Sequence, residues 1–190
     1  MDVASVTPEL EPAVRRAAPQ QLIQAALRGD EAAFETLVEE RLPRTYRMAL
    51  AILGSEADAR DAMQDAWVAA WRSLPSLLDA SRFDAWLDQI VVNACRGAMR
   101  KRRRIREIAI GEEFDVATPQ PGPDQVSERE ALNRAFSRLS IEQRTILVLH
   151  HLERRPLAAI AAALEVPVGT AKSRLHTARV ALQHSLEAER

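Results

Sequence analysis

Apolar residues recur at helical spacing near the C-terminus of the chain. Within residues 171–186 they stand three or four positions apart, as Ala171, Leu175, Ala178, Leu182 and Leu186. This spacing predicts a helix that packs one apolar stripe against a core. The polar positions beside the stripe are then expected to face outward, and they are Lys172, Ser173, His176 and Thr177.

A second apolar stripe lies just upstream of this helix. Its members are Leu157, Ile160, Ala161 and Leu164. Pro167 disfavours helical geometry at the residue before it, so the upstream helix is expected to end near Glu165. Two helices joined by a tight turn form a helix-turn-helix, and the second one has a cationic outer face. DNA is therefore the first partner to consider.

Helical spacing continues through most of the remaining sequence. Breaks at residues 29–30, 54–55 and 74–81 divide residues 21–106 into four predicted helices. Asp30 is expected to cap the second of these helices. No strand-like alternation or internal repeat is evident, which predicts an all-α protein.

Two pairs of residues have the spacing of a capping box, in which a serine and a residue three positions later cap a helix together. Ser140 with Gln143 is expected to begin a helix over residues 141–153. Ser81 with Asp84 has the same spacing, with Asp in place of Glu or Gln, and is expected to begin the fourth helix.

Proline-rich segments mark the parts expected to lie outside the helical domains. Residues 1–20 contain three prolines and little periodicity, which indicates a disordered tail. Prolines and a glycine at positions 119–123 favour an extended, flexible linker over residues 107–124. We therefore predict two small helical domains, at 21–106 and 125–190, with the helix-turn-helix in the second.

Composition narrows the class of protein further. The net charge is -1, but basic residues crowd residues 96–106 and acidic ones follow at 112–130, so the local potential favours an anionic partner. Apolar runs fall short of the roughly 18 residues of a membrane span, and no secretion signal precedes the fold, so a cytoplasmic protein without membrane insertion is expected. The single cysteine, Cys95, excludes an internal disulfide and cannot by itself hold zinc.

Two sets of motifs occur in order along the chain. The first comprises DARDAMQDAWVAAW at 58–71 and FDAWLDQIVVNACRGAMR at 83–100, and the second comprises LSIEQRTILVLHHLE at 139–153 and AIAAALEVPVGTAKSRLHTAR at 159–179. Both resemble bacterial sigma factors of the sigma-70 superfamily, in the extracytoplasmic-function (ECF) group. The PVGTAKSRL string at 167–175 is much more specific than a general helix-turn-helix pattern.

This resemblance implies a function and a set of site residues. Residues 21–106 would be a region 2 domain that binds core RNA polymerase and recognises and melts the minus-ten element. Residues 125–190 would be a region 4 domain that recognises the minus-thirty-five element. The implied contacts with core polymerase are Asp61, Gln64 and Asp65. Those with minus-ten DNA are Leu78, Asp79, Ala80, Asn93, Arg96, Arg100 and Arg103. Those with minus-thirty-five DNA are Thr170, Lys172, Ser173, Arg174, His176 and Arg179.

Further expectations follow from the same resemblance. An anti-sigma factor is expected as a partner, while a cofactor, a metal and catalytic residues are not.

Phe83 and Trp86 are expected in the core rather than stacked on bases, because they stand at helical spacing. The sequence departs from the family pattern at Gly97, Ala159, Glu165 and Thr177. Glu165 stands where glycine is usual, so the turn would hold a side chain in left-handed geometry at a cost of roughly 1 kcal/mol.

Two other functions are compatible with parts of the sequence. A dimeric helix-turn-helix regulator would bind DNA without binding core polymerase directly, and the Asp61 to Asp65 face distinguishes it from a sigma factor. An enzyme with a metal or a Cys-His nucleophile would have to use Cys95 and the histidines at 150, 151, 176 and 184. His150 and His151 point in different directions on a helix and Cys95 lies in the other domain, so this function is disfavoured.

Overall fold

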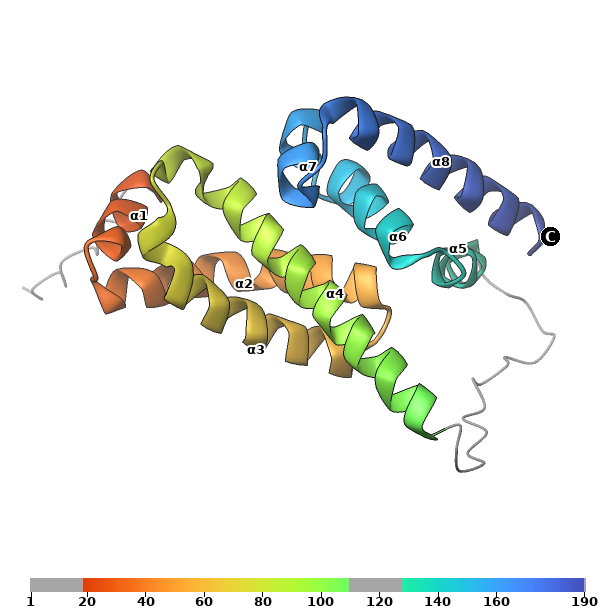
Figure 1. The fold of residues 1–190 in the computed structure, drawn as a ribbon, viewed down its shortest axis with the longest axis horizontal. Coiled ribbons are helices and arrows are strands. Elements are labelled where there is room, and N and C mark those ends of the chain that lie inside the picture. Colours follow the sequence, from red (N-terminus) through yellow and green to blue (C-terminus); the bar gives the residue numbers. More distant parts are fainter. Residues whose placement is uncertain (1–18, 110–127, 190) are drawn as a thin grey trace, which may run out of the picture.

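The computed structural model describes residues 19–109 and 128–189, and all its regular elements there are helical. An N-terminal unit contains α1 (Pro19–Leu27), α2 (Glu31–Leu53), α3 (Glu56–Ser73) and α4 (Phe83–Ala109), with the short 3-10 turns η1 (Leu74–Ser76) and η2 (Ala80–Arg82) before α4. A C-terminal unit contains α5 (Glu128–Ser137), α6 (Ile141–Leu147), the π-helical turn η3 (Val148–Leu152), α7 (Leu157–Leu164) and α8 (Val168–Glu187) (Figure 1). The predicted all-α fold with a C-terminal helix-turn-helix is confirmed.

The predicted tail and linker fall largely outside the described residues. Residues 1–18 and 110–124 belong to those parts of the chain. The first three positions assigned to the linker, 107–109, continue α4. No helix in the described ranges is both long enough and apolar enough to cross a bilayer.

Local capping sets the helix boundaries in the N-terminal unit. The Asp30 side chain accepts a hydrogen bond from the Ala33 N–H at 3.0 Å, as predicted, and begins α2. Gly54 ends α2 in the left-handed region, at φ 69°, a conformation that costs glycine little. Ser55 then caps α3 through the Asp58 N–H. The three predicted breaks are therefore confirmed.

The capping box predicted at the start of the fourth helix is wrong. The Asp79 carboxylate accepts hydrogen bonds from the Ser81 backbone N–H at 2.9 Å and from the Ser81 hydroxyl at 2.7 Å. Asp84 instead accepts from Arg41 Nε at 3.1 Å. An aspartate two residues before Ser81 forms a tighter local turn, which competes successfully with the box. The second predicted box forms, since Ser140 and Gln143 cap each other at 2.9 and 3.2 Å.

The turn of the helix-turn-helix forms with a side chain in left-handed geometry. Glu165 ends α7 at φ 56° and ψ 45°, and the Val166 N–H donates to the Ala161 carbonyl at 3.0 Å. In α8, the apolar stripe is buried at its first three predicted positions and half-buried at Leu182 and Leu186. The predicted end of the first helix and the predicted stripe of the second are both confirmed.

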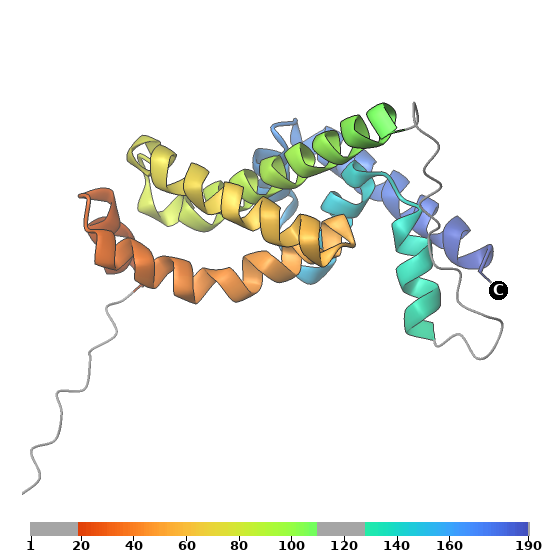
Figure 2. The ribbon, with the colours of Figure 1, turned by 90° about the horizontal axis from the view of Figure 1, so that it is seen from below.

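The two units pack side by side rather than standing apart. Helix α7 lies along α4, and α2 contacts α6 and η3 (Figures 1 and 2). One continuous set of buried apolar residues extends through both units, including Leu87 and Val91 of α4 and Ile160 of α7. Helix α8 forms the outer edge of the molecule, on the far side of α7 from α4 (Figure 1).

Candidate functional site

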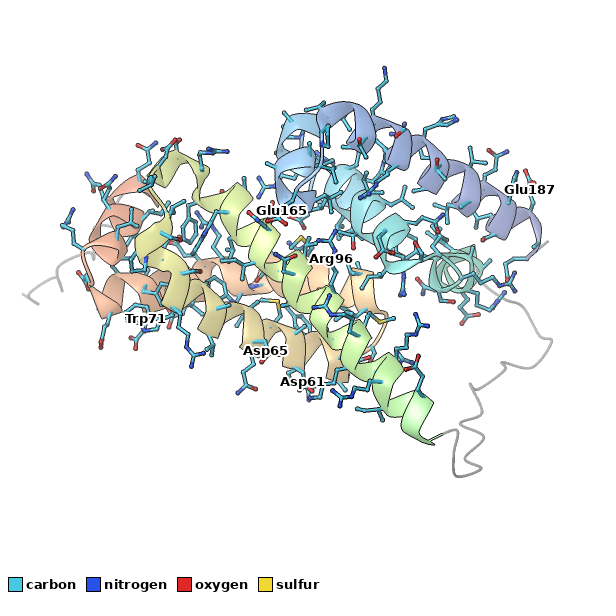
Figure 3. All side chains as sticks on the ribbon, viewed as in Figure 1. Asp61, Asp65, Trp71, Arg96, Glu165 and Glu187 are labelled. Carbon is cyan, nitrogen blue, oxygen red and sulfur yellow. The ribbon has the colours of Figure 1, made fainter. Side chains whose placement is uncertain are left out.

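A polar face on α3 brings together the three residues predicted to contact a protein partner. Asp61, Gln64 and Asp65 are all exposed, at spacings that put them on neighbouring turns of one helix face. Figure 3 shows Asp61 and Asp65 pointing away from the C-terminal unit. Met63 and Trp67 of the same helix are buried, so the carboxylates and the amide stand on a rigid support.

An apolar groove adjoins this polar face. Its lining comes from α2 and α3 and consists of Val38, Leu42, Pro43, Tyr46, Arg60, Met63, Gln64 and Trp67. Leu42 is 41% exposed, and Trp71, near the other end of α3, is 40% exposed with its ring against Phe34. Exposed apolar side chains beside a charged rim are typical of a protein-binding surface. The α2 residues of the groove were not predicted. A signal was available, because an apolar residue that stands off the buried stripe of its helix, such as Leu42, indicates an apolar surface that a partner could cover.

The connection between α3 and α4 forms one wall of a small pocket. Leu78 is 98% exposed, and Asp79 and Ala80 follow it at the start of η2. Hydrogen bonds from Ser81 lower the pKa of the Asp79 carboxyl group, which keeps it ionised. The pocket continues over Trp86 and Gln89 of α4, and Ala162 of α7 lines it from the other unit.

The two aromatic residues at the start of α4 have different surroundings. Phe83 is 1% exposed, which confirms the prediction that it belongs to the core. Trp86 packs against the core but is only partly buried, and it also lines the pocket. Their ring centroids are 5.5 Å apart. Of the two rings, Trp86 is therefore the one that borders the pocket.

Helix α4 carries the predicted minus-ten residues along one side. Asn93, Arg100 and Arg103 are exposed and Arg96 is half-buried, at spacings of three, four and three residues. The Asn93 side-chain oxygen accepts a hydrogen bond from Arg96 at 3.2 Å. Arg103 forms an exposed ion pair with Glu107 at 2.8 Å. An exposed pair of this kind contributes little to stability, so Arg103 remains free to bind a phosphate.

Helix α8 presents most of the predicted minus-thirty-five residues to solvent. Lys172, Ser173, Arg174 and His176 are exposed in its first turns, and Thr170 is half-buried beneath them. The Ser173 hydroxyl donates to the Thr170 carbonyl at 3.0 Å. Arg179 lies apart from this group, because its Nε donates to His151 Nε2 at 3.3 Å and thus points toward η3.

An ion cluster that was not predicted lies between the two units. Asp88 of α4 is 1% exposed and accepts hydrogen bonds from Arg44 of α2 at 2.8 Å and from Arg155 at 2.6 Å. Arg44 also donates to Glu153 at 2.8 Å. Burial lowers the pKa of Arg44, but Asp88 and Glu153 outweigh that effect and raise it above its usual value. An aspartate within the apolar stripe of α4, beside Leu87, was the signal that a charged partner exists.

The residues of the alternative enzyme hypothesis are not assembled into one site. Cys95 is fully buried in α4, and this burial raises its pKa to about 12, so the thiol is protonated at neutral pH and unreactive. The four histidines lie on η3 and α8, in the other unit. In the described ranges no three or more His, Cys, Asp and Glu side chains gather as metal ligands.

Comparison with known proteins assigns both units to described families. Residues 37–105 match the family model "Sigma-70 region 2", and residues 129–182 match "Sigma-70, region 4". The ECF RNA polymerase sigma factor SigE of Mycolicibacterium smegmatis is 32% identical over 166 residues, which cover 83% of this chain and 64% of that protein, slightly less than two thirds of its length. The ECF RNA polymerase sigma factor SigM of Mycobacterium tuberculosis is 32% identical, over 87% of this chain and 83% of SigM.

Two solved structures have the same fold. The sigma factor RpoE of Bartonella quintana, in complex with the anti-sigma factor NepR, superposes with a TM-score of 0.65 at 27% identity, over 83% of this chain and 98% of that one. CnrH, in complex with the cytosolic domain of CnrY, superposes with a TM-score of 0.64 at 25% identity, over 90% of this chain and 99% of that one.

Proposed function

Because this chain belongs to the sigma-70 family of RNA polymerase sigma factors, in its ECF group, we propose that it directs core polymerase to two-part promoters and promotes DNA opening. The observation that carries the proposal is the presence of both family regions in order, each on its own helical unit. Polymerase supplies the catalytic groups. The chain itself acts by binding and positioning, without a cofactor or metal of its own.

The α3 face is the proposed contact with core polymerase. Asp61, Gln64 and Asp65 offer two carboxylates and an amide to a basic or polar partner surface. The adjoining groove of α2 and α3 adds apolar area that a charged face alone lacks. Apolar contacts at the centre of an interface and charges at its rim are the usual arrangement between proteins.

The region 2 unit is the proposed reader of the minus-ten element. Arg96, Arg100 and Arg103 would neutralise phosphates, and Asn93 would contact a base or sugar near the upstream edge of the element. The pocket beside Leu78, Asp79 and Ala80 would accept a base flipped out of the non-template strand. Unstacking a base costs a few kcal/mol, and contacts in the pocket together with stacking on Trp86 would offset that cost.

The region 4 unit is the proposed reader of the minus-thirty-five element. Lys172 and Ser173 would reach base edges in the major groove, while Arg174, His176 and Arg179 would contact bases or phosphates. Thr170 and the backbone N–H groups at the start of α8 would hold a phosphate. A dimeric regulator that does not bind polymerase is not favoured, because it leaves the region 2 match unexplained.

We expect an anti-sigma factor among the partners of this chain. RpoE and CnrH, which share the fold, were solved in complexes, RpoE with the anti-sigma factor NepR and CnrH with the cytosolic domain of CnrY. A protein that covered the α3 face would prevent polymerase binding. The expected location is the cytoplasm, where core polymerase and the chromosome are found.

Binding to core polymerase tests the proposal directly. Asp61→Ala combined with Gln64→Ala is expected to weaken binding at least tenfold, because two polar contacts of about 1 kcal/mol each are lost. Glu187→Ala is the control, since Glu187 is an exposed carboxylate at the end of α8, far from the α3 face (Figure 3). Equal binding by both variants and the unmodified chain would remove the main support for the sigma-factor mechanism.

A further inference from the structure

A cleft that none of the predicted contacts uses lies between the end of α2 and the helices α5 and α6 (Figure 1). Its volume of about 530 Å³ falls within the range of small-molecule sites in proteins. Two arginines line it together with polar and apolar residues, and no acidic residue is among the lining residues that the structure describes. They are Arg47, Leu50, Ala51, Gly54, Asn133, Phe136, Ser137 and Arg144. We call this feature the Arg47–Arg144 cleft.

Arg144 of α6 is a buried cation without a counter-ion. The residue is 7% exposed, and its Nε is buried with no hydrogen-bond partner. No carboxylate of the described residues forms an ion pair with it. Burial and the positive charge of Arg102 lower the pKa of Arg144, and Glu142 offsets only part of this effect. An anion that entered the cleft would compensate the buried charge.

The arginines between the two units show the usual arrangement. Arg44 and Arg155 have side chains that are 22% and 23% exposed, and each forms an ion pair with Asp88. Buried charges are normally paired in this way, because an unpaired one loses its hydration without compensation. Arg144 is the exception to explain, since it is buried and lacks such a partner.

Arg47 of α2 adds a second cation to the same cleft. Arg47 is exposed and forms no ion pair with any described residue, so the two cations lie at the outer and inner parts of the cleft. Asn133 of α5 adds an amide that can donate. The Ser137 hydroxyl is already used, because it donates to the Arg134 carbonyl at 2.7 Å. Two guanidinium groups and an amide favour an anion with several oxygens, and guanidinium groups match phosphate geometry well.

Apolar side chains form the rest of the lining. Leu50 of α2 and Phe136 of α5 are half-buried and pack against the core. Gly54 contributes no side chain, and a Cβ built on it would stand 3.7 Å from Nη1 of Arg144. The guanidinium group is therefore open to the cleft on that side. A ligand with a phosphate and an apolar or aromatic part would match both kinds of lining, since a ring can pack on Phe136.

The end of α2 offers a competing role for Arg144. The last carbonyl groups of a helix carry partial negative charge, and Arg144 lies beside Gly54, where α2 ends. However, no hydrogen bond from the Arg144 side chain to these carbonyls is found among the described residues, and the Gly54 N–H itself donates to the Leu50 carbonyl at 2.8 Å. A helix end supplies only part of a unit charge, so most of the charge of Arg144 stays uncompensated.

We propose that the Arg47–Arg144 cleft binds a small organic phosphate, with the phosphate group held by Arg144 and Arg47 and the apolar part of the molecule against Phe136 and Leu50. None of these four residues is among the predicted contacts with polymerase or DNA, so the site goes beyond the proposed function. A free molecule is favoured over a DNA phosphate because the inner cation is buried. A phosphate of a duplex, which stays joined to its neighbours on both sides, cannot reach so far in.

Titration of the full chain with phenyl phosphate, followed by phosphorus NMR, tests the site. We expect saturable binding of one molecule per chain, at least about tenfold tighter than that of inorganic phosphate, because the ring adds apolar contacts. Arg47→Gln should weaken binding at least about tenfold, since a charge-assisted hydrogen bond is lost. Arg72→Gln is the matched control, because Arg72 is exposed at the far end of α3. Equal binding by both variants, or no saturable binding by the unmodified chain, would overturn the proposal.

Arg144→Lys separates ligand binding from a purely structural role of Arg144. The lysine keeps a positive charge beside the end of α2 but lacks the Nε–H and the planar fork. We expect it to bind phenyl phosphate at least about tenfold less tightly than the unmodified chain does. Unchanged binding would show that Arg144 does not hold the phosphate and would overturn the proposal. If the lysine variant does not fold, Arg47→Gln still decides, because its side chain is exposed and its loss should leave the melting temperature unchanged.

Binding to duplex DNA decides the source of the phosphate. If the cleft takes a free molecule, Arg47→Gln should change the affinity for a non-specific duplex by less than about twofold, measured by fluorescence anisotropy. If it weakens duplex binding as much as it weakens phenyl phosphate binding, the phosphate belongs to DNA and the proposal is wrong. These measurements use the free chain without polymerase. Their outcome is therefore independent of whether the chain acts as a sigma factor.

Discussion

Helices α4 and α8 both carry candidate DNA contacts, but the rest of the chain leaves them accessible to different degrees. Helix α8 packs on α5, α6 and α7 through one stripe and presents Lys172, Ser173 and His176 to solvent. Helix α4 packs on α2, α3 and α7, and the turn of the helix-turn-helix touches it at Gln89. The proposed minus-thirty-five reader is thus exposed in this conformation, whereas access to the proposed minus-ten reader depends on where the other unit lies.

This difference predicts that changes on the outer face of α8 affect DNA binding alone, while changes in α4 affect either protein stability or promoter opening, according to whether the residue is buried. Phe83→Ala should have the largest effect on stability. It is expected to lower the free energy of unfolding by about 3–5 kcal/mol, because the ring is fully surrounded by the core. Trp86→Ala is the matched variant. It should lower the free energy of unfolding far less than Phe83→Ala does, but it should make promoter opening less favourable by about 1–3 kcal/mol for each base stacked on the ring. Chemical denaturation and permanganate footprinting measure the two effects, and a stable Phe83→Ala protein with poor opening would reverse the two assignments.

The two lysines of the chain lie on these two helices, Lys101 on α4 and Lys172 on α8, and both are exposed. Lys172→Ala should weaken binding to a cognate minus-thirty-five duplex by about 1–3 kcal/mol and leave polymerase binding intact. Lys101→Ala should weaken DNA binding about equally for all sequences. It should also reduce the slope of the logarithm of the binding constant against the logarithm of salt concentration by about 1. Fluorescence anisotropy over a range of salt concentrations measures both. Loss of polymerase binding by Lys172→Ala would indicate misfolding and count against an independent α8 face.

Glu165 takes part in both the turn of region 4 and the contact with α4. Glu165→Gly should change the free energy of unfolding by no more than about 1 kcal/mol, because relief of left-handed strain is partly offset by the greater backbone entropy of glycine. It should also favour separation of the units, since the hydrogen bond to Gln89 is lost. Gln89→Ala removes the same bond without altering the turn. If Glu165→Gly destabilises the protein by several kcal/mol, the turn depends on the glutamate side chain in a way that the contacts described above do not explain.

A smaller effect is expected from His150, at the end of the region 4 core. Burial and the neighbouring charges of His151 and Arg179 lower the pKa of His150 below its usual value of 6.5. The unfolded chain therefore binds a proton first as the pH falls. Stability should be independent of this group above about pH 6.5 and decrease between 6.5 and the lower pKa of the folded state. Urea denaturation between pH 5 and 8 measures this loss of stability, and His150→Gln should remove it. If the free energy of unfolding depends on pH in the same way in both proteins, His150 is not the group responsible.

Local signals in the sequence predicted most of the helix boundaries. Asp30, Ser140 and the left-handed Glu165 each act through neighbours fewer than five residues away, so spacing alone identified them. The capping box at Ser81 failed because Asp79 competes for the same donors at even shorter range. The helix predicted over residues 141–153 also changes to a π-helical turn at Val148, a difference that apolar spacing does not reveal.

Long-range contacts could not be predicted in the same way. Asp88 and Arg155 are 67 residues apart and Arg44 and Glu153 are 109 apart, so their pairing depends on how the two units dock. The one available signal, the position of Asp88 within an apolar stripe, does not identify the residues that pair with it. The candidate contacts on α3 and on the outer face of α8 were easier to identify, because each set lies on one helix and follows from periodicity and family motifs.

The most direct test of the central claim is promoter-directed transcription by core polymerase with and without this chain. On a template of genomic fragments from the native organism, the account predicts that the added chain produces initiation at discrete start sites. Two shared sequence elements should precede these sites, near positions minus-ten and minus-thirty-five. If core polymerase with the chain initiates no more efficiently and no more selectively than core polymerase alone, the chain does not act as a sigma factor.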